Sequence, residues 1–236
     1  MKIALTIDVE QGITPDFIRR NLLTCQRLAK YYEIPLTLFV TGKTALKERQ
    51  TLKLFNLTHV EIGVHTHPAE HLNTTIATKD ADKLASYTKE KQRLFISKDK
   101  EAVEKTLGIK AVMFRAGRLS KNQATLEVLK ELNFKIDSSE LIPFFFHPKS
   151  LWEKPWRPYR KNGILEAPIL TFDQHLLDWT FKLKKYCLKI IDNEALVTVG
   201  LHVTLSPSLW REVERTLLKL EEEGIKFVTL LEALKT

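Results

Sequence analysis

The stretch that decides the fold is Ile3-Ala4-Leu5-Thr6-Ile7-Asp8-Val9-Glu10, a short apolar run that ends in two acidic residues. The residues of the run are apolar in succession, with little alternation, which is typical of a parallel strand covered on both faces. The first strand candidate covers residues 3–7, and further candidates, most of the same character, lie at residues 36–40, 60–64, 111–114, 134–136, 164–168, 196–202 and 226–229. The sequence therefore predicts a sheet of parallel strands.

Longer helical patterns alternate with these strands. The clearest follows Thr14, a helix-capping residue type, and repeats apolar residues at helical spacing at Ile18, Leu22, Cys25, Ala29 and Tyr32. Further helices are expected at about residues 79–107, 121–132, 175–191 and 207–223. About eight βα units without a linker predict a single α/β domain over residues 1–236. We expect its sheet to form an irregular (β/α) barrel of about seven or eight parallel strands.

The composition is that of an ordinary globular protein. Hydrophobic residues make up 44% and charged residues 28% of the 236 residues, which excludes a disordered or collagen-like chain. Lys plus Arg number 37 against 29 acidic residues, giving a net charge of +8. The basic residues form no dense block, so nucleic acid is not an expected partner. Cys25 and Cys187 lie in apolar helical patterns, and neither a disulfide framework nor a zinc–cysteine site is indicated.

The sequence also bears on location. No run reaches the roughly 20 apolar residues that a transmembrane helix needs, and the apolar stretch before Asp8 is too short for a signal peptide. We therefore expect a cytoplasmic protein without a transmembrane segment.

Residues 139–162 interrupt the rhythm of strands and helices. This segment is rich in proline and aromatic residues, among them Trp152, Trp156 and Tyr159. A long connection of this kind in a compact domain is often functional. The rings could stack on sugar faces, and a loop that buries its own hydrophobic cluster explains them equally well.

Reactive residue types gather directly after the strand candidates, where a parallel barrel carries its chemistry. They are Asp8, Glu10, His65, His67, His71, Arg115, Asp137 and His202. Asp8 and Glu10 alternate along an extended segment, so both side chains reach one side of the strand end. A carboxylate and two imidazoles form an N/O donor set that suits zinc or another divalent first-row metal.

Six short motifs share their order with a known family. They are Thr6-Ile7-Asp8-Val9-Glu10, Thr37-Leu38-Phe39-Val40-Thr41-Gly42, Glu61-Ile62-Gly63-Val64-His65-Thr66, Phe114-Arg115-Ala116-Gly117-Arg118, Asp137-Ser138-Ser139 and Leu201-His202. This set resembles the NodB-type polysaccharide deacetylases, carbohydrate esterase family 4 and its relatives. The resemblance spans nearly the whole chain and implies one catalytic domain with the NodB-like barrel of the deacetylase type.

The resemblance also implies a role for each matching residue. Asp8 would be the general base and Glu10 the carboxylate ligand of a divalent metal, zinc in the first place, with cobalt, nickel or manganese as alternatives. Arg115 would pair with Asp8, which lowers the pKa of a carboxyl group. His202 would protonate the leaving amine, and Asp137 would orient His202.

The histidines depart from the family pattern. The usual motif has two histidines four residues apart, but the residue four positions after His65 is Ala69. We favour His65 and His67 as ligands, because His65 fits the Glu-Ile-Gly-x-His frame and Pro68 fits the residue after the second histidine. His71 stands four residues after His67 and could replace either one.

The leading hypothesis is a metal-dependent hydrolase that removes an N-acyl group, in particular acetyl, from an amino sugar or a glycan precursor. The first alternative is an amidohydrolase that acts on a small non-sugar amide. The second is a non-catalytic member of the fold that binds a carbohydrate, which the altered histidine spacing motivates. Glu166, after the sixth strand candidate, could line the pocket or be a structural acid.

Overall fold

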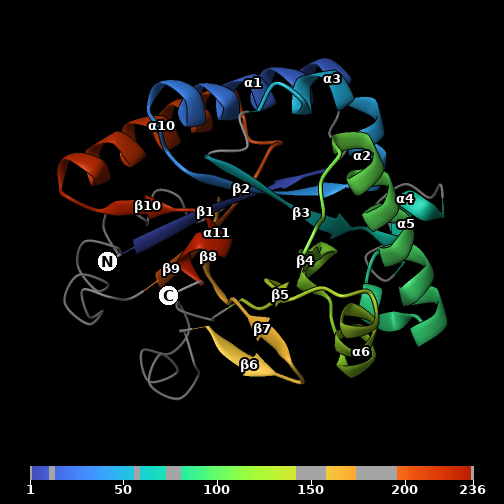
Figure 1. The fold of residues 1–236 in the computed structure, drawn as a ribbon. Helices are drawn as coiled ribbons and strands as arrows, with labels where there is room; N and C mark the ends of the chain where they lie inside the picture. Colours follow the sequence, from blue (N-terminus) through green and yellow to red (C-terminus); the bar gives the residue numbers. More distant parts are fainter. Residues whose placement is uncertain are drawn as a thin grey trace.

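Strand β1 (Lys2–Val9) lies in the interior of a sheet in which ten strands are described. The computed structural model describes residues 2–10, 14–55, 59–72, 81–141, 158–173 and 196–234 (Figure 1). On one side of β1 follow β2 (Leu36–Thr41), β3 (Val60–Thr66), β4 (Met113–Ala116), β5 (Ile136–Asp137), β7 (Ile164–Glu166) and β6 (Tyr159–Lys161). On the other side of β1 follow β9 (Leu196–His202) and β8 (Ile169–Phe172).

The strands pair in parallel apart from the hairpin of β6 and β7. Strand β10 (Lys226–Val228) pairs with the first part of β1, ahead of the part that pairs with β2. A single parallel bridge joins Leu141, which follows β5, to Ile169 of β8. The segment after β5 is thereby joined to β8 at the other side of the sheet, and the predicted irregular, largely parallel (β/α) barrel is confirmed.

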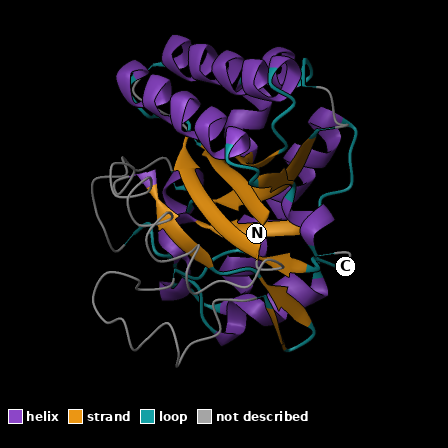
Figure 2. Cartoon of the chain, turned by 90° about the vertical axis from the view of Figure 1, so that its left-hand side faces the viewer, coloured by secondary structure: helices purple, strands orange, loops and turns teal. Residues whose placement is uncertain are grey.

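Helices cover the outside of this curled sheet. Figure 1 shows α1 and α10 side by side along one face, and Figure 2 shows the same pair above the strands. Helices α2 and α5 pack against each other near β2 and β3. The described α-helices are α1 (Pro15–Tyr31), α2 (Gly42–Lys47), α3 (Arg49–Leu52), α4 (Pro68–His71), α5 (Lys89–Leu107), α6 (Gln123–Glu131), α10 (Pro207–Glu222) and α11 (Leu230–Ala233).

Local sequence explains where the long helices begin and end. Thr14 caps α1 by accepting a hydrogen bond from the backbone N–H of Phe17, and Thr88 caps α5 in the same way. Gly108 ends α5 with a φ of 69°, a left-handed conformation that favours glycine. The helix was expected from about residue 79, but it begins at Lys89, because Thr88 supplies the cap.

Two strands differ from the prediction. The strand expected at residues 164–168 ends at Glu166, and β8 is a separate strand that begins just after Pro168. Strand β6 was not expected, because its sequence Tyr-Arg-Lys is polar and its last two residues are exposed. The helix expected at residues 175–191, with Cys187, and most of the aromatic segment, with Trp152 and Trp156, lie outside the described residues.

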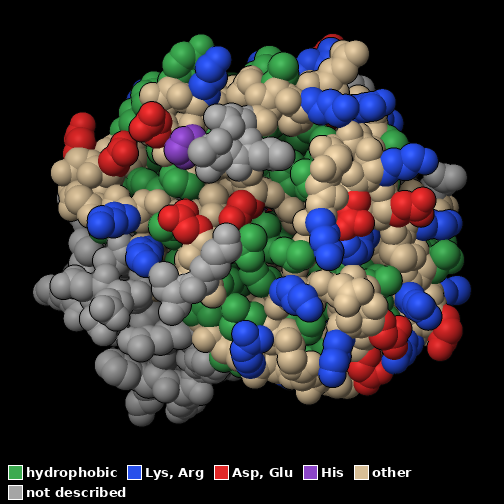
Figure 3. Space-filling view, viewed as in Figure 1, with side chains coloured by type: hydrophobic (Ala, Val, Ile, Leu, Met, Phe, Trp, Pro, Cys, Tyr) green, Lys and Arg blue, Asp and Glu red, His purple; other side chains and the backbone are tan. Residues whose placement is uncertain are grey.

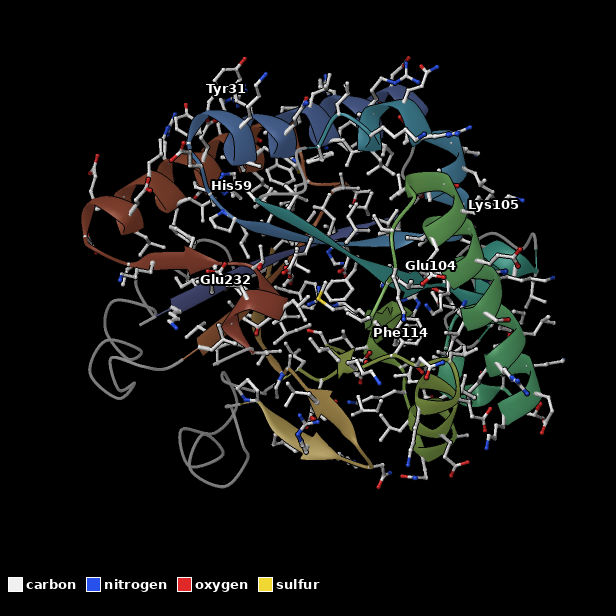
Figure 4. The ribbon with its side chains drawn as sticks, in the orientation of Figure 1. Tyr31, His59, Glu104, Lys105, Phe114 and Glu232 are labelled. Atoms are coloured by element: carbon white, nitrogen blue, oxygen red, sulfur yellow. The ribbon has the colours of Figure 1, made fainter. Side chains whose placement is uncertain are left out.

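The core fills the space between the sheet and its helices. In β1 every residue from Ile3 to Val9 is buried, as expected for a strand covered on both faces. Phe114 of β4, labelled in Figure 4, is buried and packs against Phe134 with 5.6 Å between ring centroids. On the face drawn in Figure 3, Lys and Arg side chains are scattered among acidic ones. Among the described residues no helix is long and apolar enough to cross a membrane.

Candidate active site

The register of the sheet brings the strand ends together. In β1, Asp8 lies opposite His202 of β9, and in β3, His65 lies opposite Arg115 of β4. Because all four strands are parallel, their carboxyl ends open on the same side of the barrel. A pocket of about 370 Å³ lies there, lined by Asp8, Glu10, His65, His67, Arg118, Leu119, Leu141, Phe172 and His202. Five of the eight sequence-predicted site residues thus line one pocket.

Asp8 and Arg115 form a buried ion pair, with 2.6 Å between Oδ1 of Asp8 and Nη1 of Arg115. Burial lowers the pKa of Arg115, and the charge and hydrogen bond of Asp8 oppose that effect. The guanidinium also lies over the ring of Phe39, 4.2 Å from its centroid. This pairing is the one that the resemblance implied.

Arg115 is held by further hydrogen bonds that fix its plane. Its Nη2 donates to Oγ of Ser138 and to Oγ1 of Thr6, each at 2.8 Å, and its Nε donates to the carbonyl of Ser138 at 3.0 Å. The carbonyl of Arg115 in turn lies 2.8 Å from Nδ1 of His65. One residue therefore positions both Asp8 and His65.

Glu10, His65 and His67 form a compact cluster of ligand atoms. Nε2 of His67 lies 2.6 Å from Oε2 of Glu10 and 3.0 Å from Nε2 of His65. Nε2 of His65 lies 3.6 Å from the same Glu10 oxygen. Atoms that share one tetrahedral zinc ion lie about 3.3 Å apart, since each bond is about 2.0 Å long. The spacing of these three atoms therefore fits a single metal ion.

The partners of the two imidazoles support this assignment. The carbonyl beside Nδ1 of His65 can only accept, so Nδ1 carries the proton and Nε2 of the neutral ring carries a lone pair. Nδ1 of His67 lies 2.8 Å from Oδ2 of Asp82, a buried carboxylate that fixes the same tautomer. Two imidazole lone pairs and a carboxylate oxygen then meet at one point, which requires a cation.

The pKa shifts of Glu10 and His67 arise from the contacts within this cluster. Burial by itself raises the pKa of Glu10, but the neighbouring His65 and His67 outweigh it and lower this pKa far below its usual range. Burial lowers the pKa of His67, but Asp82 and Glu10 together raise it to about 10. The two carboxylates beside His67 therefore stabilise positive charge at this cluster.

Gly117 makes room for the His67 ring. A Cβ atom at position 117 would lie 2.6 Å from Nδ1 and Cε1 of His67, closer than any real contact. A glycine is therefore required directly after β4 if this imidazole is to reach Glu10.

His202 is held by Asp173 and not, as predicted, by Asp137. Nδ1 of His202 lies 2.7 Å from Oδ1 of Asp173, which follows β8. Strand β8 is the neighbour of β9 in the sheet, whereas β5, which carries Asp137, lies five places away from β9. Burial lowers the pKa of His202, but the hydrogen bond of Asp173 and the charges of Asp8 and Glu10 raise it to about 9.

Asp137 belongs to a separate buried cluster. Nζ of Lys121 lies 2.7 Å from Oδ2 of Asp137 and also pairs with Glu166. Burial and the charge of Asp137 raise the pKa of Glu166 to about 7, against the opposing effect of Lys121. Glu166 is fully buried and is not among the residues that line the pocket.

His71 is not brought to the metal-ligand cluster. Its Nε2 lies 3.0 Å from Oδ2 of Asp99, and its ring stacks on Phe95 with 5.0 Å between centroids. Both partners belong to α5, so these contacts tie α4 to α5.

Sequence reasoning missed Asp82 and Asp173. Asp173 had a signal, since it follows the apolar run Ile-Leu-Thr-Phe just as Asp8 follows the apolar run within β1. The strand expected at residues 164–168 hides this signal, because it leaves residues 169–172 outside any expected strand. Asp82 follows no strand candidate of the sequence, and only the folded chain places it beside His67.

Comparisons with known proteins agree with this fold. Residues 2–136 match the sequence family described as polysaccharide deacetylase. A structure from Mycobacterium smegmatis, described as a polysaccharide deacetylase, has a TM-score of 0.73 at 16% identity and covers 98% of this chain and 87% of that chain. PuuE allantoinase has a TM-score of 0.74 at 14% identity, covering 98% of this chain and 88% of that chain.

A third structure, BA3943 from Bacillus anthracis, is described as a pseudoenzyme of carbohydrate esterase family 4. Its TM-score is 0.62 at 16% identity, and the match covers 99% of this chain and 65% of that chain. At such low identities these likenesses show the fold. No curated protein matches this chain in sequence.

Proposed function

This chain belongs to the polysaccharide deacetylase family, and from that premise we propose that it is a metal-dependent hydrolase that removes an N-acyl group, in particular acetyl, from an amino sugar or a glycan precursor. One observation carries the proposal. A carboxylate–imidazole–imidazole cluster shares a pocket with a proton acceptor fixed by an arginine and a proton donor fixed by an aspartate. A molecule that only bound carbohydrate would need neither of these two fixed groups.

Glu10, His65 and His67 would hold the metal, with zinc as the first choice for one carboxylate and two imidazoles. Such an ion polarises the acyl oxygen and makes hydroxide accessible near neutral pH. The hydrogen bonds that His65 and His67 make through Nδ1 keep their Nε2 atoms directed toward Glu10, where they would hold the metal.

Asp8 accepts the proton of the attacking water. Arg115 binds Oδ1 of Asp8, so the proton goes to Oδ2, which lies 3.9 Å from Nε2 of His65 and therefore beside the metal-ligand cluster. The contact with Arg115 fixes the orientation of the carboxylate, and a carboxylate is a group that can act as a base.

His202 donates a proton to the leaving nitrogen. Its Nδ1–H is bound by Asp173, so Nε2 is the atom that delivers the proton as the carbon–nitrogen bond breaks. The products are a carboxylic acid and a free amine, and the enzyme returns to its starting state when Asp8 releases the water proton and His202 takes up one proton in its place. His202 and Asp8 lie opposite each other in the β1–β9 register, which places donor and acceptor on two sides of one pocket.

A small non-sugar amide is the second candidate substrate. The similar fold of PuuE allantoinase and the modest pocket of about 370 Å³ both favour it. The non-catalytic alternative gains support from the pseudoenzyme BA3943, which shares the fold. The retained pairs Asp8–Arg115 and His202–Asp173 oppose that alternative.

Metal content and product release test the proposal together. The protein is stripped with a chelator, reloaded with zinc or cobalt, and offered N-acetylglucosamine oligomers in one set and allantoin in another. Acetate release that depends on the added metal supports deacetylation, and metal-dependent opening of allantoin supports the second candidate. Metal binding without any turnover would support the non-catalytic alternative. Absence of metal binding would refute the proposed metal site.

A further inference from the structure

A second pocket, of about 530 Å³, lies between helices α1 and α10, which run side by side over one face of the sheet (Figure 1). Its walls include Arg20 and Arg27 of α1 and Trp210, Arg211 and Glu214 of α10. None of the described residues that line it also lines the catalytic pocket. The α1–α10 pocket is therefore a separate hollow in the protein surface, and the proposed mechanism does not use it.

The spacing of these residues explains how the two helices form the pocket together. Arg20 and Arg27 are seven residues apart, close to two turns of α1, and Trp210 and Glu214 are four residues apart, about one turn of α10. Each pair therefore lies on one face of its helix. Nη2 of Arg27 lies 2.8 Å from Oε2 of Glu214 and joins the two faces. Glu214 also accepts a hydrogen bond from Tyr32, which raises the pKa of that tyrosine.

The α1–α10 pocket holds more positive than negative charge. Its lining contains three arginines and one glutamate. Glu214 is already paired with Arg27. Neither Arg20 nor Arg211 forms an ion pair within the described part of the chain, and the ring of Phe17, whose centroid lies 5.3 Å from the Arg20 guanidinium, carries no charge. Two positive charges of this pocket are therefore not neutralised by the described residues.

Trp210 adds a hydrogen-bond donor that lacks a partner. Its side chain is only 2% exposed, and none of the described residues accepts a hydrogen bond from its buried Nε1. An unpaired buried donor is costly, so most buried polar groups in folded proteins have a partner. An indole N–H can only donate, so the missing partner is an acceptor. Because Trp210 lines the α1–α10 pocket, a ligand in that pocket is a source of such an acceptor.

We propose that the α1–α10 pocket is a phosphate-binding site, distinct from the catalytic pocket. A phosphate monoester carries a charge of about −1.5 to −2 near pH 7, which matches the two guanidinium groups of Arg20 and Arg211 that lack a counter-charge. Its oxygens accept hydrogen bonds, as these two groups and Nε1 of Trp210 require. The volume of about 530 Å³ leaves room for an organic part of the ligand beside the phosphate.

Calorimetric titrations of the zinc-loaded protein test the proposal. The probes are inorganic phosphate, glucose 6-phosphate and adenosine monophosphate, with glucose and adenosine as the matched neutral molecules. We expect a phosphorylated probe to bind roughly tenfold to a hundredfold more tightly than its neutral counterpart. Tighter binding of a phosphorylated molecule than of inorganic phosphate identifies an organic phosphate as the ligand, and equal binding identifies the free ion. Absence of binding by all three phosphate probes overturns the proposal.

Two variants show whether the phosphate binds in this pocket and not at the metal-ligand cluster. Arg211→Ala should weaken phosphate binding roughly tenfold or more. It should leave zinc content and turnover unchanged, because Arg211 is exposed and lies outside the catalytic pocket. Arg215→Ala removes the same charge one turn later in α10, from a residue outside the lining, and should keep the affinity. Unchanged affinity in Arg211→Ala, or an equal loss in Arg215→Ala, overturns the proposal.

Discussion

The carboxylate of Asp173 faces Nδ1 of His202 at 2.7 Å across two neighbouring strands of the barrel, β8 and β9. This contact, together with nearby acidic charges, raises the pKa of His202 to about 9 although burial opposes the shift. An imidazole with a raised pKa is protonated below that value and loses its proton above it. The pair therefore sets the pH range in which His202 serves as a proton donor.

Replacing Asp173 by Asn should narrow this range. Without the carboxylate, the pKa of His202 falls toward its ordinary value of about 6.5, so the alkaline limb of the kcat profile should move down from about pH 9. A pH–rate profile measures the shift. Asp137→Asn is the matched comparison, since Asp137 pairs with Lys121, and it should leave the position of that limb unchanged. A shift in the Asp137 variant would return the orienting role to that residue.

Replacing Asp8 by Asn should remove the base while keeping the shape of the site. The amide can still accept the hydrogen bond from Arg115, but it cannot take a proton from water. We expect a loss of turnover of roughly 10²- to 10⁴-fold with unchanged metal content. Elemental analysis and single-turnover kinetics check both parts. A variant that keeps its activity would exclude Asp8 as the base.

Replacing His65 or His67 by Ala should lower zinc occupancy strongly. Each variant removes one of the three atoms that converge on the metal position. His71→Ala is the control, because that imidazole faces Asp99 and should leave occupancy unchanged. Mass spectrometry of the metal content compares the three proteins. Loss of zinc in the His71→Ala variant alone would show that His71 is the ligand in place of His65 and His67.

Replacing Arg115 by Met should destabilise the fold by about 3–5 kcal/mol, because it leaves the buried carboxylate of Asp8 without a counter-charge. Urea unfolding measures the free energy. The double variant Arg115→Met with Asp8→Asn should recover part of the loss, since it removes the unpaired charge. If the loss of stability in the double variant equals the sum of the losses in the two single variants, the ion pair contributes no coupling energy.

Glu166 should make stability depend on pH. Its pKa is raised to about 7 in the folded protein by burial and Asp137, so the folded state holds a proton that the unfolded state releases above about pH 4.5. The stability that this proton contributes is fully present below about pH 4.5 and is lost as pH rises through 7.

Glu166→Gln removes that titration. The free energy of unfolding of the variant relative to the wild type should therefore rise between pH 5 and pH 8, by on the order of 1 kcal/mol or more. Denaturant titrations at several pH values measure the difference. Glu222→Gln, on the exposed end of α10, should show no such trend. A flat difference for Glu166→Gln would contradict the assigned shift.

The fold was predictable to a large extent because its signals are local. Continuous apolar runs indicated buried parallel strands, and β9 has the predicted bounds, Leu196–His202. Thr14, a helix-capping residue type, marked the start of α1 as well. The sequence pattern could not reveal short elements, because they hold too few residues to show a period. Examples are the polar strand β6 and the helices α3 and α4.

The sequence by itself determined which residue types stand at the ends of the strands, because a parallel barrel collects those ends on one side. It thereby determined that Asp8, Glu10, His65, His67, Arg115 and His202 are neighbours. Only the tertiary structure decided which partner each of them takes. Hydrogen bonds depend on the order of strands in the sheet and on ångström-scale positions, so Asp173 faces His202, Asp82 faces His67, and His71 turns to Asp99.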